Sequence, residues 1–499
     1  MSTQLSPELE SIRQQVEIYA QEYELDYFPV IFEVLDWNQI NMVAAYGGFP
    51  NRYPHWRFGM EYEQLSKSYA YGLSKIYEMV INNDPSYAYL LHSNPEVDQK
   101  LVMAHVYGHS DFFKNNIYFG HTNRKMMDEM ANHKTRVKKM IDKFGMEAVE
   151  DFVDVALSLE NLIDTHAPGI RRHRETREDY SVNGEELPAV QRLKSKDYMD
   201  KFINPKDFLD QQQKRLEDER QQKKNFPENP ERDVLAFLVE NAPMERWQRD
   251  ILEMIREEAY YFVPQMQTKI MNEGWASYWH STIMTQRALK PSEFIDYADH
   301  HSGTLASHPG RLNPYKIGIE LFRDIEDRWN KGKFGKDYDD CDDMVEQKRW
   351  NKNLGLGRKK IFEVRKVHSD LTFIDTYLTE EFCREHKLFT FGYNNAKQNY
   401  EIASREFRAI KTKLLDSLTN RGQPFISVTN ANYQNRGELY LIHEHQGVDL
   451  RPDYAQETLK NLHLVWKRPV GIETKVDGAD KILYYDGKTY QELAKEREV

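Results

Sequence analysis

The stretch PEVDQKLVMAHVYGHSDFFK, residues 95–114, combines the apolar spacing of an amphipathic helix with two histidines. Asn94 stands at a preferred cap position and Pro95 at the first helical position, so the sequence predicts a helix over residues 95–114. His105 and His109 are four residues apart, which places both imidazoles on one helix face. This stretch therefore predicts both a helical fold and a candidate site.

The spacing of the two histidines is one that zinc enzymes use, because two imidazoles on adjacent helical turns can bind one ion. In the usual H-E-x-x-H motif the glutamate activates a metal-bound water, but this sequence has Val106 at that position. The change keeps the ligand geometry and removes the usual base. A bare H-x-x-x-H pattern also arises by chance, so a metal site needs support from a further ligand.

A second segment, NEGWASYWH at residues 272–280, supplies such a ligand. Several zinc peptidase families take a third ligand from a glutamate on a later helix, so we expect Glu273 to complete a zinc site with His105 and His109. His280 lies on the same helix face as Glu273 and is a candidate further ligand, base or partner of a ligand. The alternative interpretation is a packed aromatic helix in which Glu273 only forms an ion pair.

The general base has to come from another position, because Val106 cannot accept a proton. Glu63, Asp111, Glu160 and His280 are the candidate catalytic residues, since each is a titratable group in or beside a predicted helix. Glutamate–histidine pairs also resemble those of di-iron bundles, but such bundles need two E-x-x-H motifs, and the pair found has the spacing E-x-x-x-H. No phosphate-binding loop, nucleophile elbow or activated-cysteine motif occurs.

Most of the first two-thirds of the chain is predicted to be helical. The further predicted helices cover residues 7–25, 60–80, 125–144, 145–165, 247–284 and 314–331. In the last third, strands alternate with helices at 404–418 and 453–466 in the order β-α-β-β-α-β, which is that of a ferredoxin-like unit. The expected fold class is mainly α with a C-terminal α+β domain: a helical zincin-like domain followed by a ferredoxin-like unit.

Three regions are expected along the chain. Residues 1–335 form the helical domain with the histidine and glutamate site, interrupted by a polar insertion or linker at about 205–230. Residues 336–385 form a connecting helical segment, and residues 386–499 form the α+β domain with its own core. Its strands are expected to form one antiparallel sheet with both helices on the same face.

Composition limits the classes of function. The 499 residues carry a formal net charge of −12, which argues against a nucleic-acid-binding surface over the whole protein. Two cysteines cannot form a disulfide framework, and this fits a reducing compartment. No run of about 18 apolar residues occurs, so we expect a cytoplasmic protein without a membrane span.

Three segments together resemble one protein family. Residues 105–116 (HVYGHSDFFKNN), 272–280 (NEGWASYWH) and 308–318 (HPGRLNPYKIG) are similar to the stage V sporulation protein R, or SpoVR-like, family, and the similarity runs through nearly the whole chain. The resemblance implies a role in sporulation and spore cortex formation or in envelope-stress adaptation. It also implies two partners, a PrkA-type serine kinase and a von Willebrand-like protein, which are often encoded beside members of the family.

Two functions from different classes remain open. The first is zinc-dependent hydrolysis of an amide in a peptide or a peptidoglycan precursor, with His105, His109 and Glu273 as the metal ligands. The second is a non-catalytic regulatory scaffold that acts with the kinase and keeps its polar core for structure. The absence of the H-E-x-x-H glutamate at Val106 favours the scaffold, and the metal content of purified protein would separate the two.

Overall fold

The chain forms two compact units. The computed structural model describes residues 4–70, 77–169, 226–307, 309–394 and 397–495, together with positions 205, 211, 212 and 214. The first unit contains Met1–Val149 and Tyr260–Gly422, and the second contains Glu150–Ala259 and Gln423–Val499. Most of the polar insertion expected at about 205–230 lies outside the described residues.

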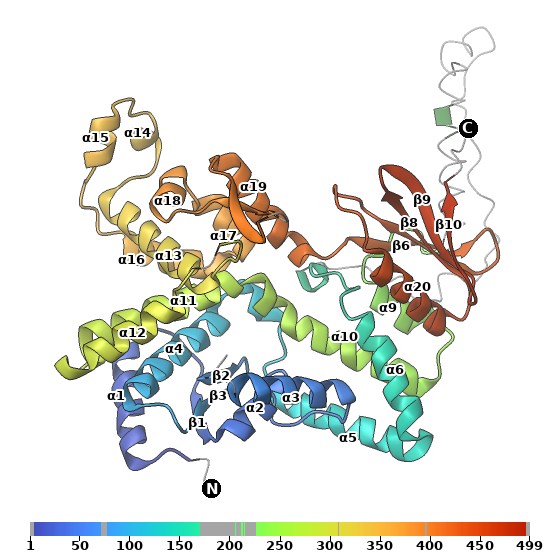
Figure 1. Cartoon of the computed structure of the whole chain (residues 1–499), viewed down its shortest axis with the longest axis horizontal. Coiled ribbons are helices and arrows are strands. Elements are labelled where there is room, and N and C mark those ends of the chain that lie inside the picture. Colours follow the sequence, from blue (N-terminus) through green and yellow to red (C-terminus); the bar gives the residue numbers. More distant parts are fainter. Residues whose placement is uncertain are drawn as a thin grey trace, which may run out of the picture. The chain divides into compact units, whose positions relative to one another are not determined.

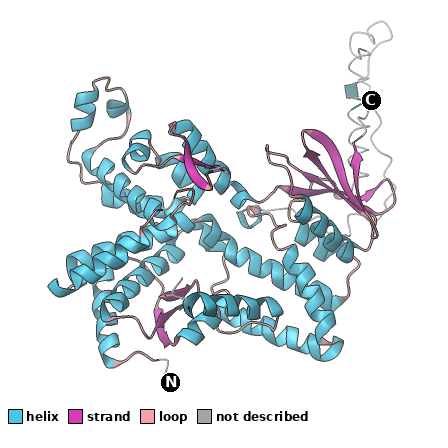
Figure 2. Cartoon of the chain, in the orientation of Figure 1, coloured by secondary structure: helices cyan, strands magenta, loops and turns pink. Residues whose placement is uncertain are grey.

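Helices make up most of the described chain (Figure 2), which confirms the expected mainly α class. Figure 1 labels the helices of the first unit, which are α1 (Pro7–Glu22), α2 (Trp37–Ala45), α3 (Trp56–Ala70), α4 (Glu96–Asn115), α5 (Met126–Phe144), α11 (Lys269–Ile283), α12 (Phe294–Thr304), α13 (Pro314–Lys331), α14 (Lys336–Asp339), α15 (Met344–Arg349), α16 (Gly357–Val367), α17 (Asp370–Tyr377), α18 (Glu380–Glu385) and α19 (Phe407–Leu418). Helices α6 (Met146–Ser158) and α10 (Arg246–Gln267) contain residues of both units.

A small sheet packs against α4 in the first unit. Its strands β1 (Val30–Leu35), β2 (Glu78–Ile81) and β3 (Ser86–Leu91) lie in the order β1-β3-β2. Strand β1 is parallel to β3, and β2 is antiparallel to β3. The prediction of a helix over 60–80 was therefore wrong in part, because α3 ends at Ala70 and β2 follows. Pairing with the largely buried β3 favours a strand for these few apolar residues.

Helix α11 packs closely against both α4 and α13. A Cβ atom on Gly108 of α4 would lie 2.7 Å from Cα of Ala276, and one on Gly274 of α11 would lie 2.4 Å from Cα of Gly318 in α13. Only glycine permits these approaches, because carbon atoms pack at about 3.5 Å or more. Each of the three glycines belongs to one of the three segments that carry the family resemblance, so these segments set the spacing of the helices.

The start of α11 is held by a side chain from a distant part of the sequence. Asp370 of α17 accepts hydrogen bonds from the backbone N–H groups of Ile270 at 2.8 Å and Met271 at 2.9 Å. It therefore caps the helix in the way that a local residue usually does. Burial raises the pKa of Asp370 to about 7, although the two N–H donors act in the opposite direction. This cap fixes α11 within one turn of Glu273.

The second unit holds a five-stranded sheet with α20 packed on it. Its elements are α9 (Val234–Asn241), β6 (Ile426–Tyr433), β7 (Glu438–His443), α20 (Pro452–Trp466), β8 (Val470–Val476), β9 (Ala479–Tyr485) and β10 (Tyr490–Ala494). The strand order is β10-β9-β8-β7-β6, and adjacent strands are antiparallel except β7 and β8, which α20 joins as a parallel pair. The expected C-terminal α+β domain is confirmed.

The order of elements differs from the ferredoxin-like expectation in two respects. Strand β4 (Thr390–Asn394) pairs, among the described strands, only with β5 (Asn399–Ser404), so it does not join the large sheet. Helix α19 packs on α17 and buries Ile410 in the core of the first unit, so its apolar face has a partner outside the α+β unit. The expected single antiparallel sheet with both helices was therefore wrong, and position 386 falls within the first unit, which ends at Gly422.

Candidate metal centre

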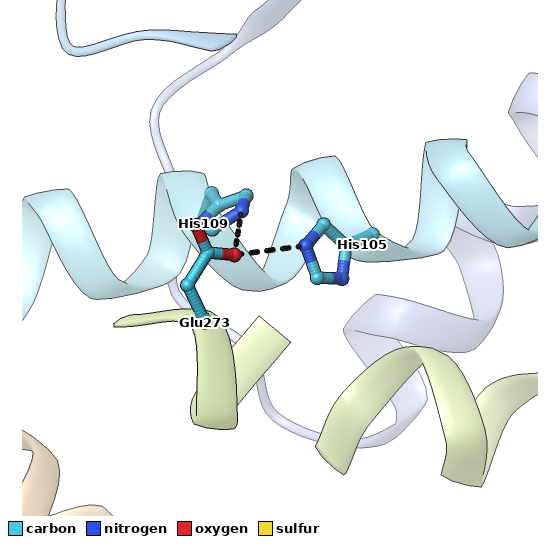
Figure 3. Close-up of side chains that lie close together, drawn as sticks. All are labelled: His105, His109 and Glu273. Carbon is cyan, nitrogen blue, oxygen red and sulfur yellow. Dashed lines mark ion pairs between the residues drawn. The ribbon is translucent and has the colours of Figure 1, made fainter. Parts of the chain in front are cut away.

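Three side chains from α4 and α11 converge in the first unit: His105, His109 and Glu273 (Figure 3). Their ligand atoms all lie within 4.8 Å of one another. The Nε2 atom of each histidine is 3.5 Å from Oε2 of Glu273. Both imidazoles are buried, and the Glu273 side chain is 18% exposed. The structure thus brings together the three residues that the sequence predicted as metal ligands.

The spacing of these atoms suits a shared ion better than direct hydrogen bonds. A separation of 3.5 Å is long for a hydrogen bond, and among the described residues Oε2 of Glu273 has no hydrogen-bond partner although it is buried. In a tetrahedral site with bonds of about 2.1 Å, two ligand atoms lie about 3.4 Å apart. Imidazole nitrogen and carboxylate oxygen are donors that zinc and related divalent metals accept. The donor set therefore fits such an ion.

Each histidine is oriented by a contact at its second ring nitrogen. Nδ1 of His109 lies 2.9 Å from Oδ1 of Asn272, so Nδ1 carries the hydrogen and Nε2 keeps its lone pair. Nδ1 of His105 lies 2.9 Å from Nδ1 of His280, whose Nε2 is 3.2 Å from Nδ1 of His301. One set of neutral tautomers satisfies this series: His105 donates to His280, and His280 donates to His301. Both candidate ligands then keep an Nε2 lone pair for the centre of the cluster.

Burial sets the charge of the cluster. It lowers the pKa of His109 to about 4, and the neighbouring His105 adds to this effect. It also lowers the pKa of His280 well below its usual value. Burial alone would raise the pKa of Glu273, but the adjacent imidazoles outweigh it and the pKa is lowered. At neutral pH these two imidazoles are neutral and the carboxyl group is ionised, which is the protonation state that metal ligands need.

Two further groups adjoin the cluster, and the sequence analysis singled out neither. Tyr315 of α13 stacks on His105 with ring centroids 6.2 Å apart, and burial raises the pKa of its hydroxyl. Glu78 of β2 interacts electrostatically with His105 and Glu273; burial raises its pKa, His105 opposes the shift and Glu273 reinforces it. Tyr315 belongs to the segment 308–318, which could have pointed to it. Glu78 lies in a stretch that was predicted to be helical and gave no signal.

Asp111, a predicted catalytic residue, has a structural environment. Its carboxylate accepts hydrogen bonds from Nε1 of Trp275 at 2.7 Å and from the backbone N–H of Asp26 at 2.8 Å. It also forms a buried ion pair with Arg365 of α16. Burial raises its pKa to about 6 despite the opposing charge of Arg365. These contacts join α4 to α11 and α16, and the catalytic role of Asp111 stays a prediction without a supporting contact.

The other predicted catalytic residues lie in different settings. Glu63 of α3 has a side chain that is 63% exposed and pairs with Lys67 at 3.1 Å. Glu160 follows α6 and belongs to the second unit. His280 contacts a predicted metal ligand, His105, through the two Nδ1 atoms. Val106, at the position of the usual glutamate, is fully buried and belongs to the hydrophobic core of the first unit.

Fold and site together define a class: a mainly helical protein with a buried two-histidine, one-glutamate cluster between two packed helices. Comparison with protein families shows to which family within this class the chain belongs. A family model described as SpoVR like protein matches residues 4–423, and one described as SpoVR-like C-terminal domain matches residues 424–477. The chain belongs to the SpoVR-like family, which confirms the resemblance of its three segments.

A relative from Escherichia coli (strain K12), the uncharacterized protein YcgB, is 27% identical over 499 residues. The match covers 94% of this chain and 92% of the relative. No solved structure matches the chain, so the zincin-like architecture of the helical unit stays a prediction. Across the described residues, no helix is long and apolar enough to cross a membrane.

Proposed function

We propose that this chain is a metal-dependent hydrolase that holds Zn²⁺ or a similar divalent ion on His105, His109 and Glu273. The observation that supports it is the position of Oε2 of Glu273, which is buried and lies 3.5 Å from both Nε2 atoms. A buried carboxylate oxygen that has no hydrogen-bond partner among the described residues is costly, and a shared cation removes that cost. The donor set is one that metallopeptidases use, so the proposed substrate is an amide of a peptide or a peptidoglycan precursor.

The residues around the cluster can be given separate tasks. When bound, the ion would acidify a water molecule and polarise the substrate carbonyl. Glu78 is the carboxylate proposed to accept a proton from the attacking water and return it to the leaving nitrogen, because it interacts electrostatically with His105 and Glu273 and burial raises its pKa. Asn272 and His280 hold the Nδ1 atoms of the two candidate ligands. His280 can also pass a proton to the partly exposed His301.

Metal analysis of the purified full-length protein tests the site. We expect about one Zn²⁺ per chain after loading and removal of loosely bound metal, and a loss of that metal in His109→Ala. His386→Ala is the matched control, because the ring of this histidine packs against Phe382 and is not part of the cluster. It should keep the full metal content. Equal metal content in the two variants would show that the histidine pair is structural.

Turnover tests the proposed reaction separately from metal binding. Peptide amides and peptidoglycan-precursor peptides would be incubated with zinc-loaded protein, and the products would be identified by mass spectrometry. Glu78→Gln should keep its metal and lose about 100-fold or more of the rate, as expected on removal of a general base. Glu63→Gln, which changes an exposed carboxylate, should retain the rate. The reverse result would assign the base to Glu63 and contradict the role of Glu78.

A second candidate function is a regulatory scaffold that acts with a PrkA-type serine kinase and a von Willebrand-like protein. The observation that favours it is Val106, which is fully buried where the H-E-x-x-H glutamate would stand. Stoichiometric zinc without turnover of any amide in the panel, combined with direct binding of the purified kinase, would support the scaffold. That outcome would refute the hydrolase.

A further inference from the structure

The first unit contains a cavity of about 660 Å³ that is separate from the histidine cluster in its lining residues. Residues 309–313, which precede α13, form one wall, and the β4–β5 hairpin forms another. Helices α13, α18 and α19 supply the remaining surfaces. The volume lies within the range of roughly 300–1,000 Å³ that is typical of sites for small molecules.

The floor of the cavity is apolar. Ile317, Phe382 and Ile410 are each at most 4% exposed and belong to the core of the first unit. Leu388 and Leu414 are partly buried and pack against the same core. A floor of this kind stabilises an aliphatic or aromatic group by removing its surface from water, at about 25 cal/mol per Å².

The rim of the cavity is cationic. Four basic side chains line it: Arg311, Lys316, Lys387 and Lys413. The carboxylate of Glu320 also lines it, but this group pairs with Arg323 at 3.1 Å. Within the described part of the chain, no carboxylate pairs with Arg311, Lys316 or Lys387. This local excess of positive charge contrasts with the formal net charge of −12 on the whole protein.

The walls are held in place by specific contacts. Gly310 has φ of +77°, and a Cβ atom on it would lie 2.7 Å from the ring of Tyr400 in β5. Glycine at this position therefore lets the loop before α13 touch the hairpin. On the other side, Nζ of Lys413 donates to the carbonyl oxygen of Phe391 at 2.8 Å. The cavity is thus preformed, which lowers the entropic cost of binding a ligand.

We propose that this cavity binds a small amphipathic anion, with an aliphatic or aromatic body on the apolar floor and a carboxylate or phosphate head at the cationic rim. The positive charge of the rim disfavours cationic ligands, and arginine together with lysine recognises carboxylates and phosphates well. The inference does not rest on the metal-dependent activity, because the cavity shares no lining residue with the histidine cluster.

Binding to the full-length protein can be measured calorimetrically with dodecanoate and dodecyl phosphate, each below its micelle concentration. Both should saturate one site. Dodecyltrimethylammonium, which has the same chain and the opposite charge, should bind about tenfold or more weakly. Equal binding of the cation, or no saturable binding of either anion, would refute the proposal. Binding of anionic phospholipid vesicles without binding of the monomeric probes would assign the surface to a membrane and also overturn it.

Charge reversal locates the site. The double variant Arg311→Glu/Lys387→Glu changes two exposed side chains at the rim and should weaken binding of dodecanoate about tenfold or more. The matched control is Lys359→Glu/Lys366→Glu, which makes the same charge change on exposed positions of α16 and should bind normally. An equal affinity in the two variants would place the ligand elsewhere. Zinc content measured in parallel should be unchanged in both, so failure of this proposal and failure of the metal site are distinguishable.

Discussion

The contact between α11 and α13 can be tested by adding a single methyl group. In Gly274→Ala the new Cβ atom would lie 2.4 Å from both Cα and the carbonyl carbon of Gly318, and 2.9 Å from the backbone nitrogen of Ile319. All three neighbours are backbone atoms, so no side chain can rotate away. Because carbon atoms pack at about 3.5 Å, the two helices must separate by about 1 Å.

Two opposing effects decide the stability of Gly274→Ala. Alanine favours a helix over glycine by about 1 kcal/mol. Overpacking of a tight interface costs about 1–3 kcal/mol and more where the backbone has to move. We therefore expect a net loss of about 2 kcal/mol. The neighbouring Glu273 should shift with the backbone, and a shift of about 1 Å is large beside a metal–oxygen bond of about 2.1 Å, so zinc affinity should fall as well.

The assay is urea denaturation of the metal-free protein, followed by measurement of zinc content after loading. Gly59→Ala is the control, because this glycine lies in α3 and a Cβ atom on it would meet nothing within 4 Å. It should be neutral or more stable by up to about 1 kcal/mol. If Gly274→Ala matched this control in stability and kept its zinc, the close packing of α11 on α13 would be refuted.

Three further predictions concern buried ionisable groups. Asp370→Asn should lower the stability by about 1–3 kcal/mol in urea denaturation, because one of the two capped N–H groups of α11 loses its acceptor. Arg365→Met should destabilise more at pH 8 than at pH 5, because Asp111 with a pKa of about 6 is neutral at the lower pH; equal losses would contradict the ion pair. As the pH falls from 6.5 to 4, the free energy of unfolding of the metal-free wild type should decrease by up to about 3 kcal/mol relative to that of His109→Gln. Above pH 6.5 His109 is neutral in both the folded and the unfolded chain, so its contribution to stability is fully present. Below pH 6.5 the unfolded chain binds a proton at this imidazole, whereas in the folded chain the pKa of His109 is about 4 and the imidazole stays neutral. A stability difference that does not change with pH would refute burial of this imidazole.

Local signals explain the parts of the fold that the sequence predicted well. The helix predicted over 314–331 agrees with α13, whose N-cap Asn313 accepts from Lys316 N–H and whose C-cap Gly332 is left-handed. The histidine spacing on α4 and the glutamate on α11 are also local patterns, and they gave the three residues that converge. Both kinds of signal can be recognised without knowing which helices touch.

The features of the fold that were not predicted depend on tertiary packing between elements far apart in the sequence. The amphipathic pattern of α19 was recognised, but amphipathicity does not identify a partner, and Ile410 is buried in the helical unit instead of on the large sheet. Strand β2 is only four residues long, and its pairing with β3 decides its structure. Glu78 was missed for the same reason, because its relevance comes from the place of β2 beside His105 rather than from any spacing in the sequence.

The replacement of the usual glutamate by Val106 and the presence of Glu78 are connected by this geometry. Val106 fills the core with an apolar side chain, so α4 supplies two candidate ligands and lacks the glutamate of the usual motif. A carboxylate on another element can do the same chemical task if it reaches the same space and if its proton affinity is matched to neutral pH. Glu78 is our candidate: burial raises its pKa, His105 opposes this shift and Glu273 reinforces it. The missing glutamate therefore removes the usual base position, and it does not by itself argue against catalysis.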